Sequence, residues 1–325
     1  MDQLYTYQKN SKINELLIRI EVAKKVIDLL PHLPKIEANL RRQTVLKSSI
    51  FSARIEGNTL EPDEYDKQST QNREKKEVMN IVRALEWIHT PRPPEMITKA
   101  TIIKLHEFVM SGLSGEIGMF RKEITAIFNR AGIALYMTPP PNYIHSLVQK
   151  LVLYIAETTD HPTIIASKSH FVFEKIHPFI DGNGRVGRLL STLVLKNGGY
   201  AMHGLVAIEE YLNEHRGEYY DLLANTNTSI TSFIEFFLEA IVVSSEESFN
   251  KLKNFKEEKP EDSLLPRRQE ILAVIREQRF CSFDMIKRKF TAIPDSSLHY
   301  DVQILIRKGF IRKLGTTRGV VYSPY

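Results

Sequence analysis

Residues 176 to 188 hold most of the side chains in this sequence that could do chemistry. They read IHPFIDGNGRVGR and combine one histidine, one aspartate, one asparagine and two arginines with three glycines. Histidine exchanges a proton near neutral pH, aspartate offers a hard oxygen ligand, and arginine binds phosphate through paired N–H groups. These residue types together indicate a site for a phosphorylated ligand with a base beside it.

The same segment predicts the end of one helix and the start of another. Pro178 disfavours the α conformation of the residue before it, so the preceding helix should end by His177 and leave the imidazole at the edge of a loop. Gly182 and Gly184 then allow backbone conformations that other residues resist. After Gly184, apolar residues recur at helical spacing, namely Val186, Leu189, Leu190, Leu193 and Val194. The loop should therefore meet a helix N-terminus, where free N–H groups and the helix dipole favour an anion.

Four side chains can be given roles at this predicted anion site. Arg185 and Arg188, three residues apart, lie on one helical face and can both reach phosphate oxygens. Asp181 can bind Mg²⁺, which keeps several waters and contacts substrate phosphates, and His177 remains as the proton acceptor. The segment is interpreted as a nucleotide-phosphate site with a built-in base. A capped turn with locally paired arginines would use the same residues, and spacing alone does not decide between the two.

Helices are predicted for most of the chain around this segment. Apolar periodicity and helix breakers place them over residues 13–30, 35–55, 74–88, 98–110, 142–158, 163–175, 187–196 and 234–243. The exception is KEITAIFNRAGIALYMTPPP, where Ile124, Ala126 and Phe128 alternate along the chain, residues 129–132 offer a turn, and Ile133 alternates with Leu135. This stretch predicts a β-hairpin that three prolines close.

Composition limits the class of protein. With 325 residues, 26% charged and 42% hydrophobic, the chain is long enough for two domains with separate cores. Cys281 is the only cysteine, which excludes an intrachain disulfide and a cysteine-based zinc site and suits a reducing compartment. The first residues lack a signal-peptide pattern, and no apolar run approaches the about 20 residues of a membrane span. A cytoplasmic protein without membrane insertion is expected.

Charge separates a basic C-terminal module from the rest of the chain. Residues 263–325 contain 12 Lys and Arg against 5 Asp and Glu, a balance of +7, whereas the remainder has 32 against 34, a balance of −2. Residues 244–262, rich in Ser, Lys and Glu, are interpreted as a helix end and linker. In the module, RRQEILAVIREQ, SFDMIKRKF and PDSSLHYDVQILIRKGF predict three helices, and residues 309–325 predict two short strands around a glycine turn.

The motif segment resembles the defining pattern of the Fic (filamentation induced by cAMP) family, H-x-F-x-[DE]-G-N-G-R-x-x-R. Residues 177–188, HPFIDGNGRVGR, match it at every defining position. GMFR at 118–121, MTPPP at 137–141 and EYYDLL at 218–223 follow in the family's order, so the resemblance covers about residues 40–240. It implies a mainly α fold with the hairpin as a flap. The implied organisation is an N-terminal helical region at 1–95, a Fic catalytic core at 96–243, a linker at 244–262 and a small winged helix-turn-helix domain at 263–325.

Fic enzymes usually transfer AMP from ATP to a hydroxyl side chain (Ser, Thr or Tyr) of a target protein and release pyrophosphate. The resemblance implies that His177 takes the proton of the attacking hydroxyl, that Phe179 anchors the loop, and that Asp181 holds Mg²⁺. It implies that Arg185 contacts the β-phosphate and Arg188 the γ-phosphate. The implied ATP-binding residues are Asp181, Gly182, Asn183, Gly184, Arg185, Val186, Gly187 and Arg188 of the motif, Leu135, Tyr136 and Met137 of the flap, and Tyr219 and Asn227 at the adenine. Tyr219 is equally compatible with a buried tyrosine whose hydroxyl is satisfied.

A second motif, SARIEGN at residues 52–58, matches the [ST]-x-x-x-E-[GN] signature that Fic proteins use for self-inhibition. Ser52 and Glu56 lie one helical turn apart on one face, and Gly57 should end that helix. The resemblance implies a salt bridge from Glu56 to Arg188 that blocks the γ-phosphate. In some relatives the same glutamate positions a water that removes AMP, so the net direction of the reaction stays open.

An autoinhibited protein adenylyltransferase is the leading hypothesis, and a DNA-binding regulator with a nucleotide-sensing Fic core is the alternative. In a DNA-binding module, the third helix would enter the major groove, and Arg312, Lys313 and Arg318 of the wing would contact phosphates. That helix should present Asp295, His299, Asp301 and Gln303, which suits a protein-contact module equally well, and a homodimer is expected. Packing or surface positions are predicted for His106, His170 and His203, a core position is predicted for Trp87, and no reactivity is assigned to Cys281.

Overall fold

The computed structural model describes residues 5–29, 34–61, 65, 73–90, 92–113, 116–128, 134–253, 261, 264–291, 293–315 and 319–325. The chain divides into two compact units, Met1–Lys253 and Asn254–Tyr325. Each unit has a hydrophobic core of its own.

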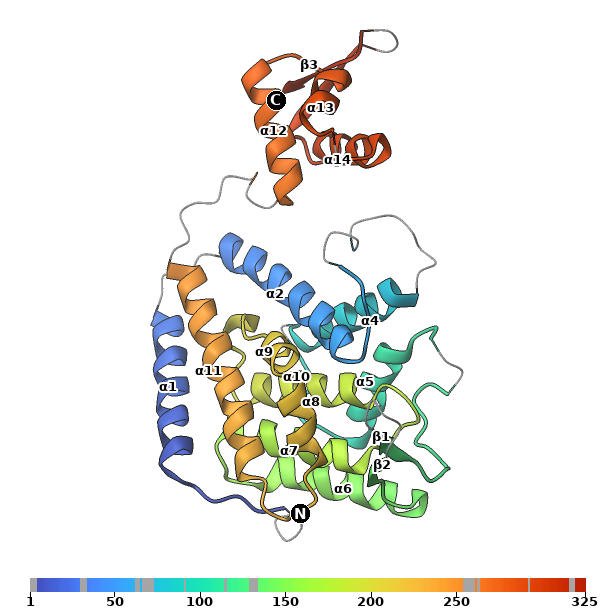
Figure 1. Ribbon diagram of the computed structural model, residues 1–325. Coiled ribbons are helices and arrows are strands. Elements are labelled where there is room, and N and C mark those ends of the chain that lie inside the picture. The colour runs from blue at the N-terminus through green and yellow to red at the C-terminus, as the bar shows by residue number, and fades with distance from the viewer. Residues whose placement is uncertain are drawn as a thin grey trace. The chain divides into compact units, whose positions relative to one another are not determined.

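Helices build the first unit, which confirms the prediction of a mainly α fold (Figure 1). In chain order they are α1 (Ser11–Leu29), α2 (Pro34–Ile55), α4 (Arg73–Ile88), α5 (Lys99–Met110), α6 (Pro141–Glu157), α7 (Pro162–Ile176), α8 (Asn183–Asn197), the 3₁₀ turn η1 (Met202–Gly204), α9 (Glu209–Glu214), α10 (Arg216–Ala224) and α11 (Thr231–Lys253). The short helices α9 and α10 were not predicted from the sequence.

The pair α7 and α8 lies in the middle of this unit (Figure 1). Helices α5 and α4 pack on α8, helices α6 and α11 pack on α7, and α1 runs along α11. Ile13 of α1, Ile55 of α2 and Phe173 of α7 belong to one continuous core. The described core residues of the N-terminal region expected at residues 1–95 therefore pack into the core that surrounds the motif.

Of the two helix ends that flank the motif loop, the end of α7 agrees with the prediction and the start of α8 differs from it. Helix α7 ends at Ile176, as Pro178 predicts. Gly182, with a φ of 82°, precedes α8, which begins at Asn183 and not at the predicted residue 187. The first turn of α8 contributes little to the apolar periodicity from which its start was predicted. Gly184 and Arg185 consequently belong to that first turn.

Helix α11 ends at Lys253, so the first part of the segment interpreted as a helix end and linker, residues 244–253, is helical. Ser244, Ser245 and Ser248 are buried in it. The Ser244 hydroxyl accepts a hydrogen bond from the Ala207 N–H at 2.7 Å, and the Ser248 hydroxyl donates to the Leu205 carbonyl at 2.6 Å. The serines looked like linker residues because they are polar, but small hydroxyl side chains can pack when they find partners.

The predicted hairpin is present as β1 (Ala126–Phe128) and β2 (Ala134–Met137), which pair antiparallel. Ala126 lies opposite Met137, and the register shifts after Ile127. The Thr138 N–H donates to the Thr125 carbonyl at 3.1 Å at the base of the hairpin. The predicted turn at residues 129–132 and Ile133 lie outside the described residues.

The second unit contains α12 (Pro266–Gln278), β3 (Cys281–Ser282), α13 (Phe283–Lys289), α14 (Asp295–Arg307), β4 (Ile311–Leu314) and β5 (Val321–Pro324). Its three helices and the β4–β5 pair follow the predicted order, and β3 adds a third strand on the other side of β5. Asp301 was predicted to lie on the surface of the third helix, which is wrong. Its side chain is fully buried and paired with two arginines of α12. Arg312 and Lys313 are exposed on β4, and Arg318 lies outside the described residues.

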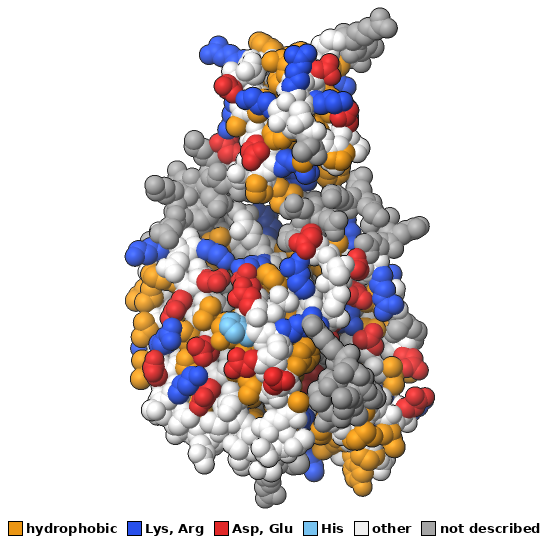
Figure 2. All heavy atoms as spheres, viewed as in Figure 1, with side chains coloured by type: hydrophobic (Ala, Val, Ile, Leu, Met, Phe, Trp, Pro, Cys, Tyr) orange, Lys and Arg blue, Asp and Glu red, His pale blue; other side chains and the backbone are white. Residues whose placement is uncertain are grey.

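On the face shown in Figure 2, acidic and basic side chains are interspersed over the described surface of both units. None of the helices in the described ranges combines the length and apolar character that crossing a membrane requires.

Candidate functional site

The motif loop is fastened by its own side chains. Asn183, the first residue of α8, accepts a hydrogen bond from the Phe179 N–H at 2.9 Å and donates to the Phe179 carbonyl at 2.8 Å. The Phe179 ring is fully buried, as its predicted anchoring role requires. The side-chain amide of Asn183 was predicted to bind phosphate, but in this structure it shapes the loop.

His106 of α5 supports the loop from the neighbouring helix. Its ring stacks on Phe179 with 3.8 Å between the centroids. Nδ1 accepts a hydrogen bond from the Gly118 N–H at 3.0 Å, so Nε2 carries the proton and donates to the Asp181 carbonyl at 3.1 Å. Burial lowers the pKa of His106, which keeps the ring neutral. The prediction of a packing residue was incomplete, since His106 also holds the backbone of the motif.

Arg121 joins the motif loop to the flap. Its side chain is buried, with Nε donating to the His177 carbonyl at 2.8 Å, Nη1 to the Glu123 carbonyl and Nη2 to the Pro139 carbonyl, both at 2.6 Å. Its backbone N–H donates to the Pro178 carbonyl at 2.9 Å. GMFR was part of the family resemblance, but no role was predicted for Arg121, because the sequence does not show which backbone carbonyls surround an arginine.

His177 follows the last residue of α7 in the left-handed conformation, with φ 47° and ψ 61°. Its Nδ1 lies toward Glu174, whose Oε2 is 3.9 Å away. This arrangement favours a proton on Nδ1 and leaves Nε2 as the acceptor. Burial lowers the pKa of His177 to about 4, against smaller opposing effects of a hydrogen bond to the Glu174 backbone and of the Glu56 charge. The imidazole is therefore neutral at pH 7 and able to accept a proton.

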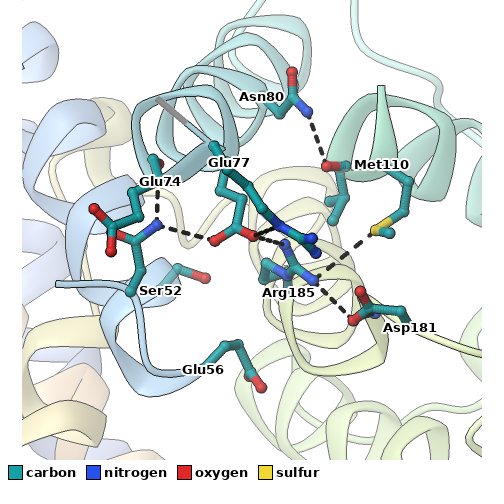
Figure 3. Close-up of polar contacts among 12 residues, drawn as sticks. Ser52, Glu56, Glu74, Glu77, Asn80, Met110, Asp181 and Arg185 are labelled. Atoms are coloured by element: carbon teal, nitrogen blue, oxygen red, sulfur yellow. Dashed lines mark hydrogen bonds and ion pairs between the residues drawn. The ribbon is translucent and has the colours of Figure 1, made fainter. Parts of the chain in front are cut away.

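Arg185 and Asp181 pair within the motif, with 3.0 Å between Nη2 and Oδ1. Figure 3 shows Arg185 between Asp181 and Glu77 of α4, whose Oε1 lies 3.8 Å from Nη1. Arg185 is buried, yet its Nε and Nη1 have no hydrogen-bond partner among the described residues. Buried donors without acceptors suit a site that receives oxygens from a ligand. The Asp181 side chain is 51% exposed, so its carboxylate can also reach a cation.

Arg188 is held by α2, from 132 to 136 residues away along the chain. Its guanidinium is fully buried. Nε donates to the Ser52 hydroxyl at 2.9 Å, and Nη2 donates to the Ser52 carbonyl at 2.8 Å and to Oε1 of Glu56 at 2.9 Å. This is the ion pair between Glu56 and Arg188 that the second motif implied. Within the described ranges, Nη1 of Arg188 makes no hydrogen bond.

The Glu56 carboxylate also covers the start of α8. A Cβ atom at Gly184 would collide with Oε1 of Glu56, so the carboxylate lies directly against the backbone of the first helical turn. That turn has free N–H groups and the positive end of the helix dipole. Glu56 thus occupies the anion site that the sequence predicted for phosphate.

Two further titratable groups of α7, His170 and Glu174, face α8 near Arg188. His170 Nε2 pairs with the Tyr219 hydroxyl at 2.8 Å, and burial lowers the pKa of His170 to about 3. Burial and the neighbouring Glu56 raise the pKa of Glu174 to about 8. A Cβ at Gly187 would lie 2.6 Å from Oε1 of Glu174, so this glycine makes room for the carboxyl group. Both groups of α7 are uncharged at pH 7.

Two of the predicted ATP-binding side chains lie in the core. Tyr219 is 1% exposed and its hydroxyl is paired with His170, so the buried alternative is the one found. Val186 is fully buried, and its N–H donates to the Gly182 carbonyl at 3.0 Å as part of α8. Neither side chain can contact a ligand in this arrangement.

Asn227 is exposed, and its backbone N–H donates to the Asn225 side chain at 2.9 Å. Tyr220, the next residue of α10 after Tyr219, also reaches this region. Its hydroxyl donates to the Ile55 carbonyl at 3.1 Å, next to Glu56. Burial first, and then the charge of Glu56, raise the pKa of Tyr220 to about 12, whereas Arg188 opposes the rise.

The flap residues divide by exposure. The Tyr136 ring is partly buried beneath the Lys175 ammonium, 4.2 Å from its centroid, and its hydroxyl is hydrogen-bonded to Tyr5. Met137 is 61% exposed. The Leu135 side chain lies outside the described residues. Of the two described flap side chains, Met137 is the more accessible to a ligand.

A cation at Asp181 would depend on the ligand for most of its coordination. No cluster of three or more metal-binding side chains occurs among the described residues. Mg²⁺ is commonly held by one or two carboxylates together with phosphate oxygens and water. The single accessible carboxylate of Asp181 fits that mode.

Comparison with known proteins identifies the same part of the chain. Residues 96–195 match the Fic/DOC family. Protein adenylyltransferase Fic of Drosophila erecta is 30% identical over 172 residues, which are 51% of this chain and 32% of the relative. Protein adenylyltransferase Fic of Culex quinquefasciatus is 27% identical over 239 residues, which are 68% of this chain and 45% of the relative. The chain therefore spans less than half the length of these curated relatives.

Solved structures share the fold. A Fic family protein from Desulfovibrio desulfuricans G20 gives a TM-score of 0.66 at 22% identity, over 99% of this chain and 98% of that one. A Fic domain containing signaling protein from Bacteroides thetaiotaomicron VPI-5482 gives 0.60 at 20% identity, over 77% and 99%. The match to the Fic/DOC family over residues 96–195 includes the complete motif, and the solved structures share the fold.

Proposed function

We propose that the protein is an adenylyltransferase that moves AMP from ATP to a hydroxyl side chain of a target protein, and that Glu56 holds it in an inhibited state. The observation that carries the proposal is the ion pair of Glu56 and Arg188 at the start of α8, beside a neutral His177. The curated relatives that carry the name protein adenylyltransferase support the reaction type.

The triphosphate would bind where N–H donors of the site make no hydrogen bond among the described residues. Nε and Nη1 of Arg185 make no hydrogen bond within the described ranges and can take the β-phosphate, while Arg188 takes the γ-phosphate. The backbone of the first turn of α8, around Gly184, adds N–H donors. Asp181 would hold Mg²⁺, which when bound neutralises phosphate charge. Positioning and charge neutralisation are the main requirements of phosphoryl chemistry.

His177 acts as the general base in this proposal. Its Nε2 accepts the proton of the target hydroxyl while the target oxygen attacks the α-phosphorus and pyrophosphate departs. The lowered pKa keeps the imidazole unprotonated before the reaction. Phe179, Asn183 and Arg121 fix the backbone from which this ring projects.

Glu56 inhibits by occupying two parts of the phosphate site at once. Its carboxylate takes Nη2 of Arg188 and lies against Gly184. A γ-phosphate in the same place would face a like charge and lose its arginine partner, which costs several kcal/mol for closely placed groups. Displacement of Glu56 would therefore allow productive binding of ATP.

The flap would align the target. An extended target segment can add to β1 or β2 by main-chain hydrogen bonds. Arg121 connects the Pro139 carbonyl beside the flap to the His177 carbonyl. The register of a target strand would in this way be coupled to the position of the base.

The proposal is tested by AMP incorporation from α-labelled ATP with Mg²⁺, using self-modification as the readout. The wild type should label weakly and Glu56→Gly strongly. Glu56→Gly/His177→Ala should lose about 10²- to 10⁴-fold of the Glu56→Gly rate, because it lacks the general base.

Matched controls are available in the same chain. Glu61→Gly removes a glutamate five residues further on, which pairs with Arg54 at 3.2 Å, and should stay as inactive as the wild type. His215→Ala in the Glu56→Gly background removes an exposed histidine and should keep full labelling. Equal labelling of Glu56→Gly and Glu56→Gly/His177→Ala would refute the assigned base, and equal labelling of wild type and Glu56→Gly would refute the inhibition.

A further inference from the structure

Glu174 is a buried acid of the site to which the proposed function gives no role. It lies in the last turn of α7, and its side chain is 9% exposed. Oε2 lies 3.9 Å from Nδ1 of His177, and Oε1 has no hydrogen-bond partner among the described residues. An unpaired polar atom in a protein interior costs free energy, so its presence beside the base points to a function.

Two glycines of α8 make room for two carboxyl groups. Gly184 and Gly187 are three residues apart, so they lie on one face of the helix, where neighbouring Cβ positions are about 5–6 Å apart. Glu56, the residue after α2, lies against the first glycine, and Glu174 of α7 lies against the second. The two carboxyl groups therefore approach the same face of α8 from different parts of the chain.

We propose that Glu174 is a positioning residue for His177. The carboxylate of Glu174 faces Nδ1 of His177 and stabilises the imidazolium that forms during AMP transfer. This inference rests on the proposed function. In the step, the O–H bond of the target breaks and its proton moves to Nε2, while a bond forms between the target oxygen and the α-phosphorus. The bond from the α-phosphorus to pyrophosphate breaks and its electron pair leaves on pyrophosphate. Glu174 itself is unchanged.

The charge of Glu174 depends on the groups that face it. These are His170 on α7, His177 just after α7, Arg188 on α8, Glu56 just after α2 and Tyr219 on α10. Burial first, and then the charge of Glu56, raise the pKa of Glu174 to about 8, whereas Arg188 opposes the rise. The carboxyl is therefore mostly protonated at pH 7 and ionises as the pH rises through about 8. Without the Glu56 carboxylate a like charge is gone, so the pKa of Glu174 falls.

The test has an activity arm in the Glu56→Gly background. AMP incorporation at saturating ATP should rise as the pH increases from 7 to 9. Glu56→Gly/Glu174→Gln should lack this rise and be at least about tenfold slower at pH 9, because a carboxylate near an imidazole shifts its pKa by about 1 to 3. The KM for ATP should stay the same, since Glu174 contacts the base and not the phosphates.

A spectroscopic arm needs no activity. The ring ¹³C resonance of His177, assigned by its loss in His177→Asn, should show an inflection near pH 8 in the nucleotide-free wild type. Glu174→Gln should abolish the inflection, and Glu56→Gly should move it to lower pH. Lys175→Gln is the matched control, because burial lowers the pKa of Lys175 to about 8, and it should keep the inflection.

The outcomes separate this inference from the proposed function. An inflection that persists in Glu174→Gln, or a Glu174→Gln rate within twofold of its parent at pH 9, would overturn the role of Glu174. If no variant transfers AMP, the proposed function is wrong, and the His177 inflection still decides whether Glu174 is coupled to His177.

Discussion

Both units bury arginine next to carboxylate, but they satisfy these groups differently. In the second unit, one carboxylate oxygen of Asp301 accepts a hydrogen bond from Nε of Arg268 at 2.9 Å, and the other accepts one from Nε of Arg267 at 2.5 Å. No buried atom of these three side chains lacks a partner in the described structure. In the first unit, Arg185, Arg188 and Glu174 have buried donor or acceptor atoms that make no hydrogen bond among the described residues. A fully satisfied cluster stabilises a fold, whereas a partly satisfied one is arranged for something that binds.

The largest expected effect comes from breaking the satisfied cluster. Asp301→Asn should destabilise the second unit by about 3–5 kcal/mol, because it removes the carboxylate charge that faces the buried Arg268. The first unit should be unaffected. Trp87, the only tryptophan, lies in α4, so its fluorescence reports unfolding of the first unit alone, while far-UV circular dichroism reports both. In a denaturant titration, an early circular dichroism transition should appear with an unchanged Trp87 transition.

Asp295→Asn is the matched control, because the exposed Asp295 pairs with Lys287 at the surface. It should leave both transitions in place. A shift of the Trp87 transition in Asp301→Asn would show that the two units do not unfold independently.

The buried position of Asp301 could have been found in the sequence. Asp301 lies three residues after Leu298 and four before Leu305, on the apolar face of the helix, but its charge suggested the surface. Likewise, the serines of α11 looked like a linker because polarity was weighed above helical spacing. In both cases a polar residue on an apolar face had a partner that lies elsewhere in the fold.

The motif loop was predictable because its chemistry is contiguous, and Pro178 and the glycines determine its backbone locally. Its supports were not. His106 contacts a carbonyl 75 residues away and Arg121 one 56 residues away, and no local pattern encodes such contacts. The pairing of Glu56 with Arg188, across 132 residues, was predicted only through the family resemblance.

The second prediction concerns Arg121, a buried arginine whose described partners are mostly carbonyls. Arg121→Lys should slow AMP transfer in the Glu56→Gly background by about 10²-fold. A single ammonium cannot replace the guanidinium, whose several N–H groups join the loop to the flap. Small misplacements of the reacting groups then lower the rate strongly. Rates of labelling at saturating ATP measure the effect. The exposed Arg83→Lys serves as the control and should not change the rate. An unchanged rate in Arg121→Lys would show that loop and flap are placed without this fork.

The third prediction opens the partly satisfied cluster. Glu56→Gln keeps the size of the side chain but removes its charge, so ATP with Mg²⁺ should bind about tenfold more tightly, equivalent to about 1.4 kcal/mol. Titration calorimetry measures the affinity. The Trp87 unfolding transition should barely move, in contrast to the effect of Asp301→Asn on its own unit. Glu61→Gln is the control for loss of a charge in the same segment, and equal affinities of Glu56→Gln and wild type would contradict a carboxylate that competes with phosphate.

The smallest expected effect distinguishes the role of Ser52, which orients the Arg188 guanidinium, from that of Glu56, which blocks it. The Ser52 hydroxyl bonds Nε of Arg188, while Glu56 bonds Nη2, so the hydroxyl should keep orienting the guanidinium after Glu56 has left. Ser52→Ala in the Glu56→Gln background should therefore weaken ATP binding about threefold, within the about 0.5–1.5 kcal/mol of one hydrogen bond. Ser49→Ala, which removes a buried hydroxyl bonded to the Val45 carbonyl one turn earlier, should leave the affinity unchanged. If Ser52→Ala instead strengthens ATP binding, Ser52 belongs to the inhibitory contact, and the guanidinium of Arg188 reaches phosphate only after the side chains of Ser52 and Glu56 both release it.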